Sequence, residues 1–290
     1  MRYLVTGATG FIGSHLTRRL IGLGETVSAF VQFGVDRLAL RDVLEQLDVH
    51  EVDLRTAGAI ARAIDRIDPT IVFHCAAAGV TDPFLPPDEA IRTNVYGTIN
   101  LLRAVKGRAR VIVLRTAGEL DALNVYAASK AASWQFCRMY RRTQGWPIAG
   151  AMLFQVYGPG QSKKNLIPLA IEAALAGRDF PMTSGQQWRD WIYIDDVIDA
   201  LIVQAQADRF DVESVEIGSG VTTSVRDVVA MVYDQVRQGG RPLIGVLPDR
   251  PGEVEEQCAD AETTAAILKW RAKVSIADGL CQTIEAMKNE

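Results

Sequence analysis

The sequence predicts an α/β fold in which helices cover both faces of a parallel sheet. Short apolar runs rich in β-branched residues alternate with segments whose apolar residues recur at helical spacing. A glycine-rich stretch joins the first apolar run to the first helical segment. Hydrophobic residues make up 48% of the 290-residue chain, which is enough for a sizeable core.

The first two elements are a strand at residues 3–6 and a helix that continues to Leu20, separated by Gly7, Gly10 and Gly13. The first glycine permits a tight turn, the second lets backbone approach a pyrophosphate, and the third lets the helix lie close to the sheet. Free N–H groups and the positive end of the helix dipole then face the anion. The spacing is G-x-x-G-x-x-G, and in this context it favours nucleotide binding over an ordinary αβ turn.

The elements that follow keep a regular order. We expect further strands at 25–31, 49–52, 70–75, 110–114 and 148–154. We expect helices at 37–47, 59–67, 88–105 and 126–142. This alternation is typical of a parallel sheet that is buried on both faces.

Past Tyr157 the alternation loosens. Helices are expected at 165–176, 225–236, 261–268 and 276–287, and one more starts near Asp195. Strands are expected at 188–194, 215–217 and 243–247. We therefore predict a dinucleotide-binding domain at 1–155, with 188–206 packing back on it, and a smaller substrate-binding lobe at 156–290.

Composition excludes several classes of function. The formal net charge of −4 does not favour nucleic acid or an anionic membrane as a partner. The four cysteines are scattered without C-x-x-C spacing, so we expect reduced thiols and no metal site. There is no apolar run long enough to span a bilayer and no signal-peptide pattern, so a cytoplasmic protein is expected.

Polar residues gather at the carboxyl ends of the expected strands, where ligands bind in an open parallel sheet. Asp53, His74 and Thr116 stand there, and Tyr126 and Lys130 open the next helix four residues apart, on one face. An ammonium beside a phenol is expected to lower a tyrosine pKa that is normally about 10. Such a tyrosine can exchange a proton with an alcohol or ketone while a nicotinamide exchanges the hydride, and Thr116 can bond the same oxygen. The alternative is a chance pairing of Tyr and Lys, and position in the sheet is what argues against it.

Seven motifs in order carry a resemblance to a known family. They are Thr6–Gly13, Asp53–Leu54, His74–Ala77, Asn94–Thr98, Tyr126–Lys130, Val156–Gly160 and Arg189–Val197. As a set they resemble the extended short-chain dehydrogenase/reductase family, the NAD-dependent epimerase/dehydratase group that modifies sugar nucleotides. The resemblance covers nearly the whole chain and implies a Rossmann-type doubly wound sheet with a smaller C-terminal α/β lobe.

The resemblance also implies roles for individual residues in binding the cofactor. Pyrophosphate would be bound by Gly7, Gly10, Phe11, Ile12 and Gly13. Adenine would be flanked by Asp53 and Leu54, and Ala76 and Ala77 would lie along the cofactor. Lys130 would hold the nicotinamide ribose and tune Tyr126.

In catalysis, the resemblance makes Tyr126 the acid/base, gives Thr116 the family's serine/threonine role, and makes Asn94 the structural or proton-relay asparagine. An asparagine that bonds backbone at a helix kink is an equally physical interpretation of Asn94. Arg189 would meet the substrate diphosphate, and Asn165 and Gln155 would also contact the substrate. The alternative for Arg189 is a surface ion pair with Asp190 or Asp195. The family also implies a homodimer in which helices 88–105 and 126–142 pair across a two-fold axis.

The choice between NAD and NADP stays open on the sequence. NAD enzymes usually place an acidic residue at the end of the second strand, where it binds the ribose hydroxyls. Val31, Gln32 and Phe33 stand there instead. Asp36 is too late in the chain, and Arg37 is only a candidate for a 2′-phosphate.

The segment between Thr116 and Tyr126 departs from the family pattern. The two residues are only ten positions apart, so the family's longer insert is missing and we expect a more open site. Dehydratases of the group follow the serine/threonine with a paired Asp-Glu. Here Glu119 is the only acidic residue of Thr116-Ala117-Gly118-Glu119, and it stands one place too late, which argues against 4,6-dehydration.

The leading hypothesis is therefore an NAD(P)-dependent oxidoreductase acting on a nucleotide-activated sugar. It either reduces a 4-keto sugar or epimerises C4 through a transient ketone, and the missing acidic ribose clamp leans towards the reductase. Two alternatives remain: a reductase of a non-sugar ketone, and a catalytically silent NAD(P)-binding regulatory protein.

Overall fold

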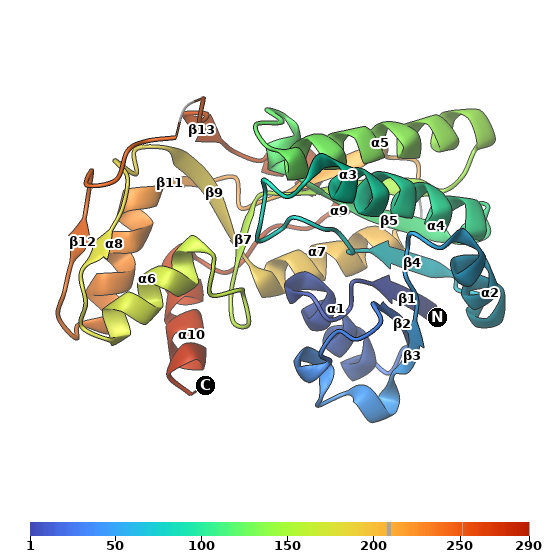
Figure 1. Ribbon diagram of the computed structural model, residues 1–290, viewed down its shortest axis with the longest axis horizontal. Helices are drawn as coiled ribbons and strands as arrows, with labels where there is room; N and C mark the ends of the chain where they lie inside the picture. The colour runs from blue at the N-terminus through green and yellow to red at the C-terminus, as the bar shows by residue number, and fades with distance from the viewer. Residues whose placement is uncertain (208–209, 251, 290) are drawn as a thin grey trace. The chain divides into compact units, whose positions relative to one another are not determined.

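A computed structural model describes residues 1–207, 210–250 and 252–289, and the chain divides into two compact units (Figure 1). The first unit comprises Met1–Met152 and Ile198–Val215, and the second comprises Leu153–Val197 and Glu216–Glu290. Helix α7 (Ile194–Gln206) begins in the second unit and ends in the first. The functional division at residue 155 stays a prediction.

The first unit is built on a seven-stranded sheet in the order β10-β6-β5-β4-β1-β2-β3. Its strands are β1 (Arg2–Thr6), β2 (Thr26–Val31), β3 (Asp48–Glu51), β4 (Ile71–His74), β5 (Arg110–Thr116), β6 (Ile148–Leu153) and β10 (Ser214–Ile217). Strand β1 pairs in parallel with β2 and β4, and β2–β3 and β4–β5 are parallel as well. Thr6 faces His74 in register, so both residues end their strands at one edge. The predicted α/β class with a parallel sheet is confirmed.

Helices bury both faces of this sheet. They are α1 (Phe11–Gly22), α2 (Ala57–Ile67), α3 (Pro87–Ala90), α4 (Gly97–Val105) and α5 (Val125–Gln144) (Figure 1). Side chains alternate along β1: Leu4 belongs to a core cluster with residues of α2, α4 and α5. Its neighbour Tyr3 stacks on Phe73 at 6.0 Å and accepts a hydrogen bond from Gln206 of α7. The two faces therefore have separate apolar cores.

The second unit has a small sheet in which β9 (Trp188–Tyr193) pairs with β7 (Gln155–Tyr157), β11 (Thr222–Ser224) and β13 (Glu256–Gln257). Strands β8 (Phe180–Pro181) and β12 (Pro242–Leu243) form a separate pair. The unit's own helices are α6 (Leu166–Leu175), α8 (Val225–Val236), α9 (Ala261–Leu268) and α10 (Ile276–Lys288). Ser224 and Ser275 cap α8 and α10 with their hydroxyls, as serine does at helix N-termini.

Two sequence predictions of secondary structure are wrong. Residues 37–47 form only two short 3-10 turns, η1 (Leu38–Leu40) and η2 (Leu44–Gln46). There Arg18 of α1 binds the Asp42 carboxylate and the Ala39 carbonyl, so tertiary contacts fix a compact irregular segment. The strand expected at 243–247 ends at Leu243, because the chain turns through Gly245 at φ +78°.

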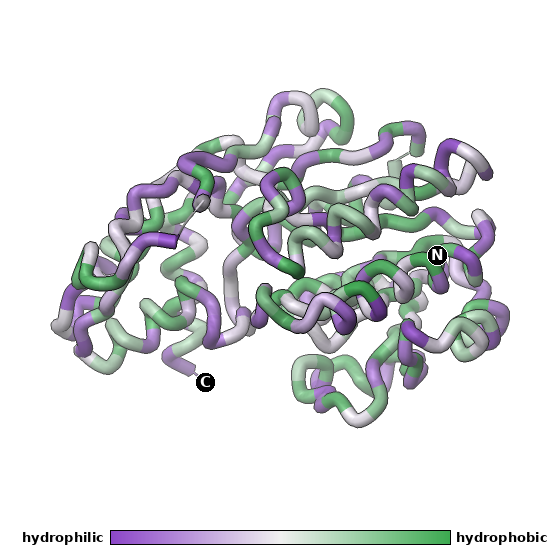
Figure 2. Tube along the Cα trace, turned by 45° about the horizontal axis from the view of Figure 1, so that its top comes forward, coloured by the Kyte–Doolittle hydropathy of each residue, from purple (hydrophilic) through white to green (hydrophobic). Residues whose placement is uncertain are grey.

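The helix expected over 88–105 forms with an irregular centre. Between α3 and α4 lies a π-helical stretch, η3 (Ile91–Tyr96), and Asn94 sits in it. Such single π-turns are often found at functional sites. No helix in the described part of the chain is long and apolar enough to cross a membrane, and in Figure 2 hydrophobic and hydrophilic positions alternate along the trace.

Candidate active site

The turn between β1 and α1 requires its glycines. Gly7 has φ +68°, and a Cβ there would lie 2.7 Å from both the backbone N and the Cα of Ala76. A Cβ on Gly13 would lie 2.2 Å from the carbonyl oxygen of Gly7. Helix α1 therefore approaches the turn as closely as backbone allows. Its N-cap, Gly10, supplies no side-chain cap and its first turn holds no acidic residue, so the arrangement fits a phosphate.

His74 lies buried at the end of β4 between two threonines. Its Nδ1 is 2.8 Å from Oγ1 of Thr6, and its Nε2 is 2.8 Å from Oγ1 of Thr98. The Thr98 hydroxyl already donates to the carbonyl of Asn94 at 2.6 Å, so Nε2–H must donate to Thr98 and Nδ1 must accept from Thr6. Burial, with the charge of Lys130 second, lowers the pKa of His74 to about 3. His74 is therefore a neutral bridge and not an acid or base at neutral pH.

Asn94 connects the loop after β4 to helix α5. Its amide nitrogen donates to the carbonyl of Ala78 at 2.9 Å and to Oγ of Ser129 at 2.8 Å, and its oxygen accepts from the N–H of Ala78 at 2.7 Å. Ser129 in turn donates to the carbonyl of Tyr126 at 2.7 Å. Asn94 thus anchors the first turn of α5, and a proton-relay role for it stays a prediction.

Tyr126 and Lys130 lie one turn apart near the start of α5. The Asn124 side chain caps this helix by accepting from the N–H of Ala127 at 2.8 Å. Lys130 is 5% exposed. Neither its ammonium nor the Tyr126 hydroxyl has a hydrogen-bond partner among the residues that the structure describes. Since the Lys130 side chain is almost wholly buried and no described residue hydrogen-bonds its ammonium, a bound ligand would supply bonds that the described protein groups do not.

The expected lowering of the tyrosine pKa is wrong for this structure. Burial raises the pKa of Tyr126 to about 12, and the negative charge of Glu119 raises it further. Burial also lowers the pKa of Lys130, which Glu119 opposes. Loss of solvent around the phenol outweighs any help from the ammonium, so Tyr126 is protonated at neutral pH.

The loop after β4 closes on Tyr126 from one side. The carbonyl of Pro83 accepts the backbone N–H of Tyr126 at 3.1 Å. A Cβ on Gly79, which has φ +94°, would lie 3.1 Å from Cβ of Tyr126. Glycine at 79 therefore lets this loop touch the tyrosine.

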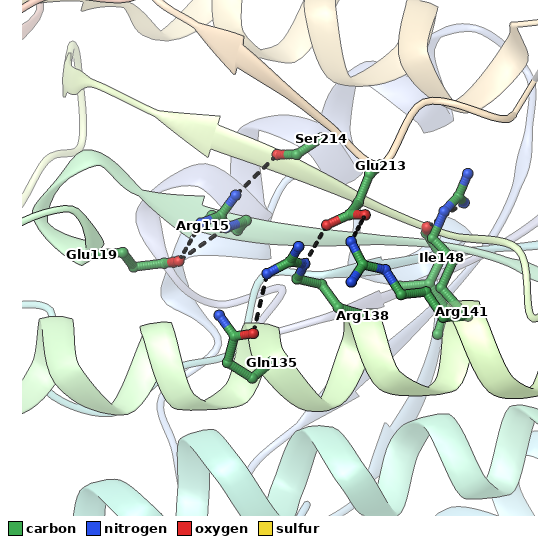
Figure 3. Close-up of polar contacts among 9 residues, drawn as sticks. Arg115, Glu119, Gln135, Arg138, Arg141, Ile148, Glu213 and Ser214 are labelled. Atoms are coloured by element: carbon green, nitrogen blue, oxygen red, sulfur yellow. Dashed lines mark hydrogen bonds and ion pairs between the residues drawn. The ribbon is translucent and has the colours of Figure 1, made fainter.

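Thr116 ends β5 and caps the single 3-10 turn η4 (Ala117–Glu119). Its Oγ1 accepts from the N–H of Gly118 at 3.3 Å, and its own N–H donates to Oε1 of Glu119 at 3.1 Å. No described residue accepts the Thr116 hydroxyl proton, so that proton remains available. The other oxygen of Glu119 pairs with Arg115, whose guanidinium also reaches Ser214 (Figure 3). Both carboxylate oxygens of Glu119 therefore have a partner within the protein.

Asp53, which is predicted to flank the adenine, is held by Arg55, whose Nη2 lies 2.6 Å from Oδ2 of Asp53. Hydrogen bonds from Arg55 keep the Asp53 pKa below its usual value. Leu54 is buried, and a Cβ on Gly97 would lie 3.0 Å from Cβ of Leu54. The packing of this segment thus depends on a glycine that the sequence analysis did not single out as structural.

The end of β2 carries no acidic side chain. Gln32 and Phe33 are exposed, Phe33 by 80%. Asp36 accepts from the N–H of Leu38 at 2.8 Å, so it caps η1, and Arg37 forms an ion pair with Glu51. Arg37 is therefore already paired, which weakens it as a candidate for a 2′-phosphate.

The candidate substrate residues belong to the second unit. Gln155 is exposed in β7, and Asn165 is the N-cap of α6 without a side-chain cap bond. Arg189 is 7% exposed, donates to the carbonyl of Trp188 at 2.7 Å and pairs with Glu253 at 3.3 Å. The sequence analysis missed Glu253, because nothing local marks a partner 64 residues away.

The carboxylate of Asp190, one of the two ion-pair partners considered for Arg189, bonds other groups. This buried carboxylate accepts from Ser219 N–H and Oγ, from Gly220 N–H and from Ala259 N–H, at 2.6–3.1 Å. A Cβ on Gly218 would lie 2.4 Å from Oδ2 of Asp190. Asp190 thus secures the turn that follows β10 against β9.

The fold and this site define a class: Rossmann-type α/β proteins with a glycine-rich β1–α1 turn and a Tyr–Lys pair on the helix after β5. Comparison with known proteins refines the class. The sequence model of the NAD dependent epimerase/dehydratase family matches residues 3–218. The chain belongs to that family.

Individual relatives share the whole length of the chain. It is 29% identical to a UDP-glucose 4-epimerase of Mycolicibacterium smegmatis, over 100% of this chain and 99% of the relative. The crystal structure of a dTDP-glucose 4,6-dehydratase from Streptomyces venezuelae, which has NAD bound, is 27% identical, with a TM-score of 0.88 over 100% of this chain and 98% of that one. A UDP-glucose 4-epimerase from Thermotoga maritima, solved with UDP-glucose, has a TM-score of 0.91 over 100% and 99% of the two chains at 24% identity, which shows the fold.

Proposed function

We propose that this chain is an NAD(P)-dependent oxidoreductase that acts on a nucleotide-activated sugar, either reducing a 4-keto sugar or epimerising C4 through a transient ketone. One observation carries the proposal. Tyr126 and Lys130 lie one helical turn apart after β5, and neither polar end is hydrogen-bonded by a residue in the described part of the chain. Together with a β1–α1 turn that fits a phosphate, this supports a role for the two groups beside a dinucleotide and its substrate.

The residues present fit the cofactor. Gly7, Gly10 and Gly13 leave the start of α1 free for a pyrophosphate, and the buried amine of Lys130 would bond the ribose hydroxyls. When bound, the nicotinamide supplies or accepts the hydride. Tyr126 supplies or accepts the proton, and the free Thr116 hydroxyl can donate to the same substrate oxygen.

The protonation state of Tyr126 favours the reductive direction. With its pKa raised to about 12, the phenol holds its proton at neutral pH. A carbonyl oxygen that gains negative charge on hydride addition is then met by an acid in place. This supports net reduction of a ketone more than epimerisation, because the oxidative first step of an epimerisation needs Tyr126 to accept a proton as a base.

The described residues that follow Thr116 in η4 offer no free carboxylate for dehydration. Elimination of water needs an acid and a base beyond those of the redox step. Glu119 is the acidic residue nearest Thr116 in the chain. One of its carboxylate oxygens accepts the backbone N–H of Thr116, and the other forms the ion pair with Arg115. We therefore do not propose 4,6-dehydration, although relatives of this chain carry that name.

The test is native mass spectrometry of the purified protein followed by turnover assays. Co-purified NAD, with UDP-glucose or dTDP-glucose epimerised and no net absorbance change at the NADH band, would establish the epimerase. Net consumption of NADH or NADPH with a nucleotide-linked 4-keto sugar would establish the reductase. Failure to bind any nicotinamide dinucleotide, or a Tyr126→Phe variant with wild-type turnover, would overturn the proposal.

A further inference from the structure

A buried ion pair flanks Thr116 in the chain. The side chains of Arg115 and Glu119 are 14% and 2% exposed, and Nη2 of Arg115 lies 2.8 Å from Oε2 of Glu119. The remaining carboxylate oxygen, Oε1, accepts the backbone N–H of Thr116 at 3.1 Å. One carboxylate therefore holds both the arginine and the residue that carries the candidate hydroxyl.

The side chain of Arg115 is surrounded by close contacts with Trp134, Ser214 and Gly150. Its Cζ stacks 4.6 Å over the ring of Trp134, and its Nη1 donates to Oγ of Ser214 at 3.2 Å. A Cβ on Gly150 would lie 2.8 Å from Cδ of Arg115, 2.7 Å from Oγ of Ser214 and 2.9 Å from Cη2 of Trp134. Figure 3 shows Arg115 extended between Glu119 and Ser214. Burying a charge pair is costly without such complete bonding, so the local structure has been shaped around this pair.

Several titratable groups interact electrostatically with Lys130, and one of them, Glu119, also interacts with Tyr126. They are His74 at the end of β4, Cys75 directly after it, Cys137 on α5, Arg115 on β5 and Glu119 on η4. His74 is neutral, and burial keeps the two thiols protonated. Glu119 and Arg115 are therefore the charged members of this set. The negative charge of Glu119 favours the protonated form of both Tyr126 and Lys130.

We propose that Arg115 and Glu119 are positioning residues of the active site: Glu119 fixes Thr116 and keeps a negative charge facing Tyr126 and Lys130, while Arg115 fixes Glu119. The inference rests on the proposed function, because that function assigns Thr116 and Tyr126 to the proton-transfer step. Its two parts, geometry and charge, are separable by substitution.

Glu119→Gln tests the charge. Glutamine keeps a carbonyl oxygen for the Thr116 N–H but removes the negative charge. We expect the pKa of Tyr126 to fall by about 0.5–1 unit. This pKa is measured by ultraviolet titration of the cofactor-free protein. The signal of Tyr126 is the tyrosinate absorbance that is lost when Tyr126→Phe is introduced into the wild type and, separately, into Glu119→Gln. With the nucleotide sugar that the wild type turns over, the pH profile of kcat should move to lower pH by a similar amount.

Glu119→Ala tests the geometry, because it removes the acceptor as well. We expect kcat to fall about 10- to 100-fold, as for loss of a well-placed hydrogen-bonding group, with the KM for NADH within about threefold. If Glu119 acts through Thr116, the same substitution made on a Thr116→Ala background should cost much less. Arg115→Lys should retain more activity than Arg115→Gln.

Glu213→Gln is the matched control. It breaks the half-exposed ion pairs of Glu213 with Arg138 and Arg142 of α5; Figure 3 shows the pair with Arg138. The substitution should leave kcat, the pH profile and the Tyr126 titration unchanged. If Glu119→Gln leaves both the titration and the profile in place, and Glu119→Ala keeps wild-type kcat, the inference is wrong even if Tyr126→Phe is inactive. An active Tyr126→Phe variant would instead remove the proposed function. Should Glu119→Ala fail to fold, the Gln and Lys variants still decide the matter.

Discussion

The carbonyl of Gly7 occupies the space that a side chain at position 13 would need: a Cβ on Gly13 would lie 2.2 Å from that oxygen. The same turn meets the backbone of Ala76, which lies 2.7 Å from where a Cβ of Gly7 would be. Helix α1, its preceding turn and the loop after β4 are therefore fitted to one another by backbone alone. The start of α1 can be moved only at a cost to any ligand held there.

We expect Gly13→Ala to weaken dinucleotide binding at least about tenfold, because the helix must move away from the turn and overpacking costs about 1–3 kcal/mol. Gly22→Ala, in the same helix, is the matched control, because nothing lies within 4 Å of its added Cβ. That variant should bind normally and be more stable by up to about 1 kcal/mol. Isothermal titration with NADH and thermal unfolding measure both effects, and equal affinities for the two variants would contradict this account.

Lys130→Met should separate stability from function. It replaces an ammonium that no described residue hydrogen-bonds, at the end of a buried side chain, by an apolar chain of similar length, so unfolding should become harder by about 1–3 kcal/mol. Affinity for NADH should fall about tenfold, and turnover should fall with it. Chemical denaturation and fluorescence titration give the two numbers. A variant that is less stable than the wild type would show that the ammonium has a stabilising partner after all.

The sequence predicted the sheet and the glycine turn because both depend on short-range patterns. Alternating apolar runs specify β1 to β6, and the spacing of Gly7, Gly10 and Gly13 specifies a turn followed by a helix. The prediction of a helix at 37–47 was wrong, because the apolar residues there have helical spacing while contacts from Arg18 hold the segment in an irregular conformation. Periodicity cannot register a partner that lies outside the segment.

The site was predicted less completely. Tyr126, Lys130 and Thr116 were identified as candidates from their order in the chain, and their roles stay predictions. The electrostatics could not be predicted in this way, because the pKa of Tyr126 depends on burial and on Glu119, whose orientation follows from its bonds to Arg115 and Thr116. The ion pair of Arg189 with Glu253 was missed for the same reason: it joins residues distant in sequence.

His74 should make stability depend on pH in the acid range. Its pKa in the folded protein is about 3, below the usual 6.5, so between those values the unfolded chain binds a proton that the folded protein does not. Stability must then fall as pH drops from 6.5 towards 3, by up to about 1.4 kcal/mol per unit, and is unaffected by His74 above 6.5. His74→Gln should be less stable at pH 7 but should show a flatter pH dependence. Denaturation curves at pH 7 and pH 5 test this, and parallel slopes would contradict it.

We expect the chain to form a homodimer through the helical segment 88–105, which includes η3 and α4, and through α5 over 126–142, as the family resemblance implies. Large apolar side chains remain exposed on η3 and α5: Ile91 by 43%, Tyr96 by 57%, Phe136 by 40% and Met139 by 39%. Phe136→Glu should therefore shift light scattering at micromolar concentration from dimer to monomer, because a buried unpaired carboxylate opposes association. Ile267→Glu, at a 38% exposed position of α9 in the second unit, is the control and should leave the dimer intact. A monomeric wild type, or a Phe136→Glu variant that remains dimeric, would rule out this interface.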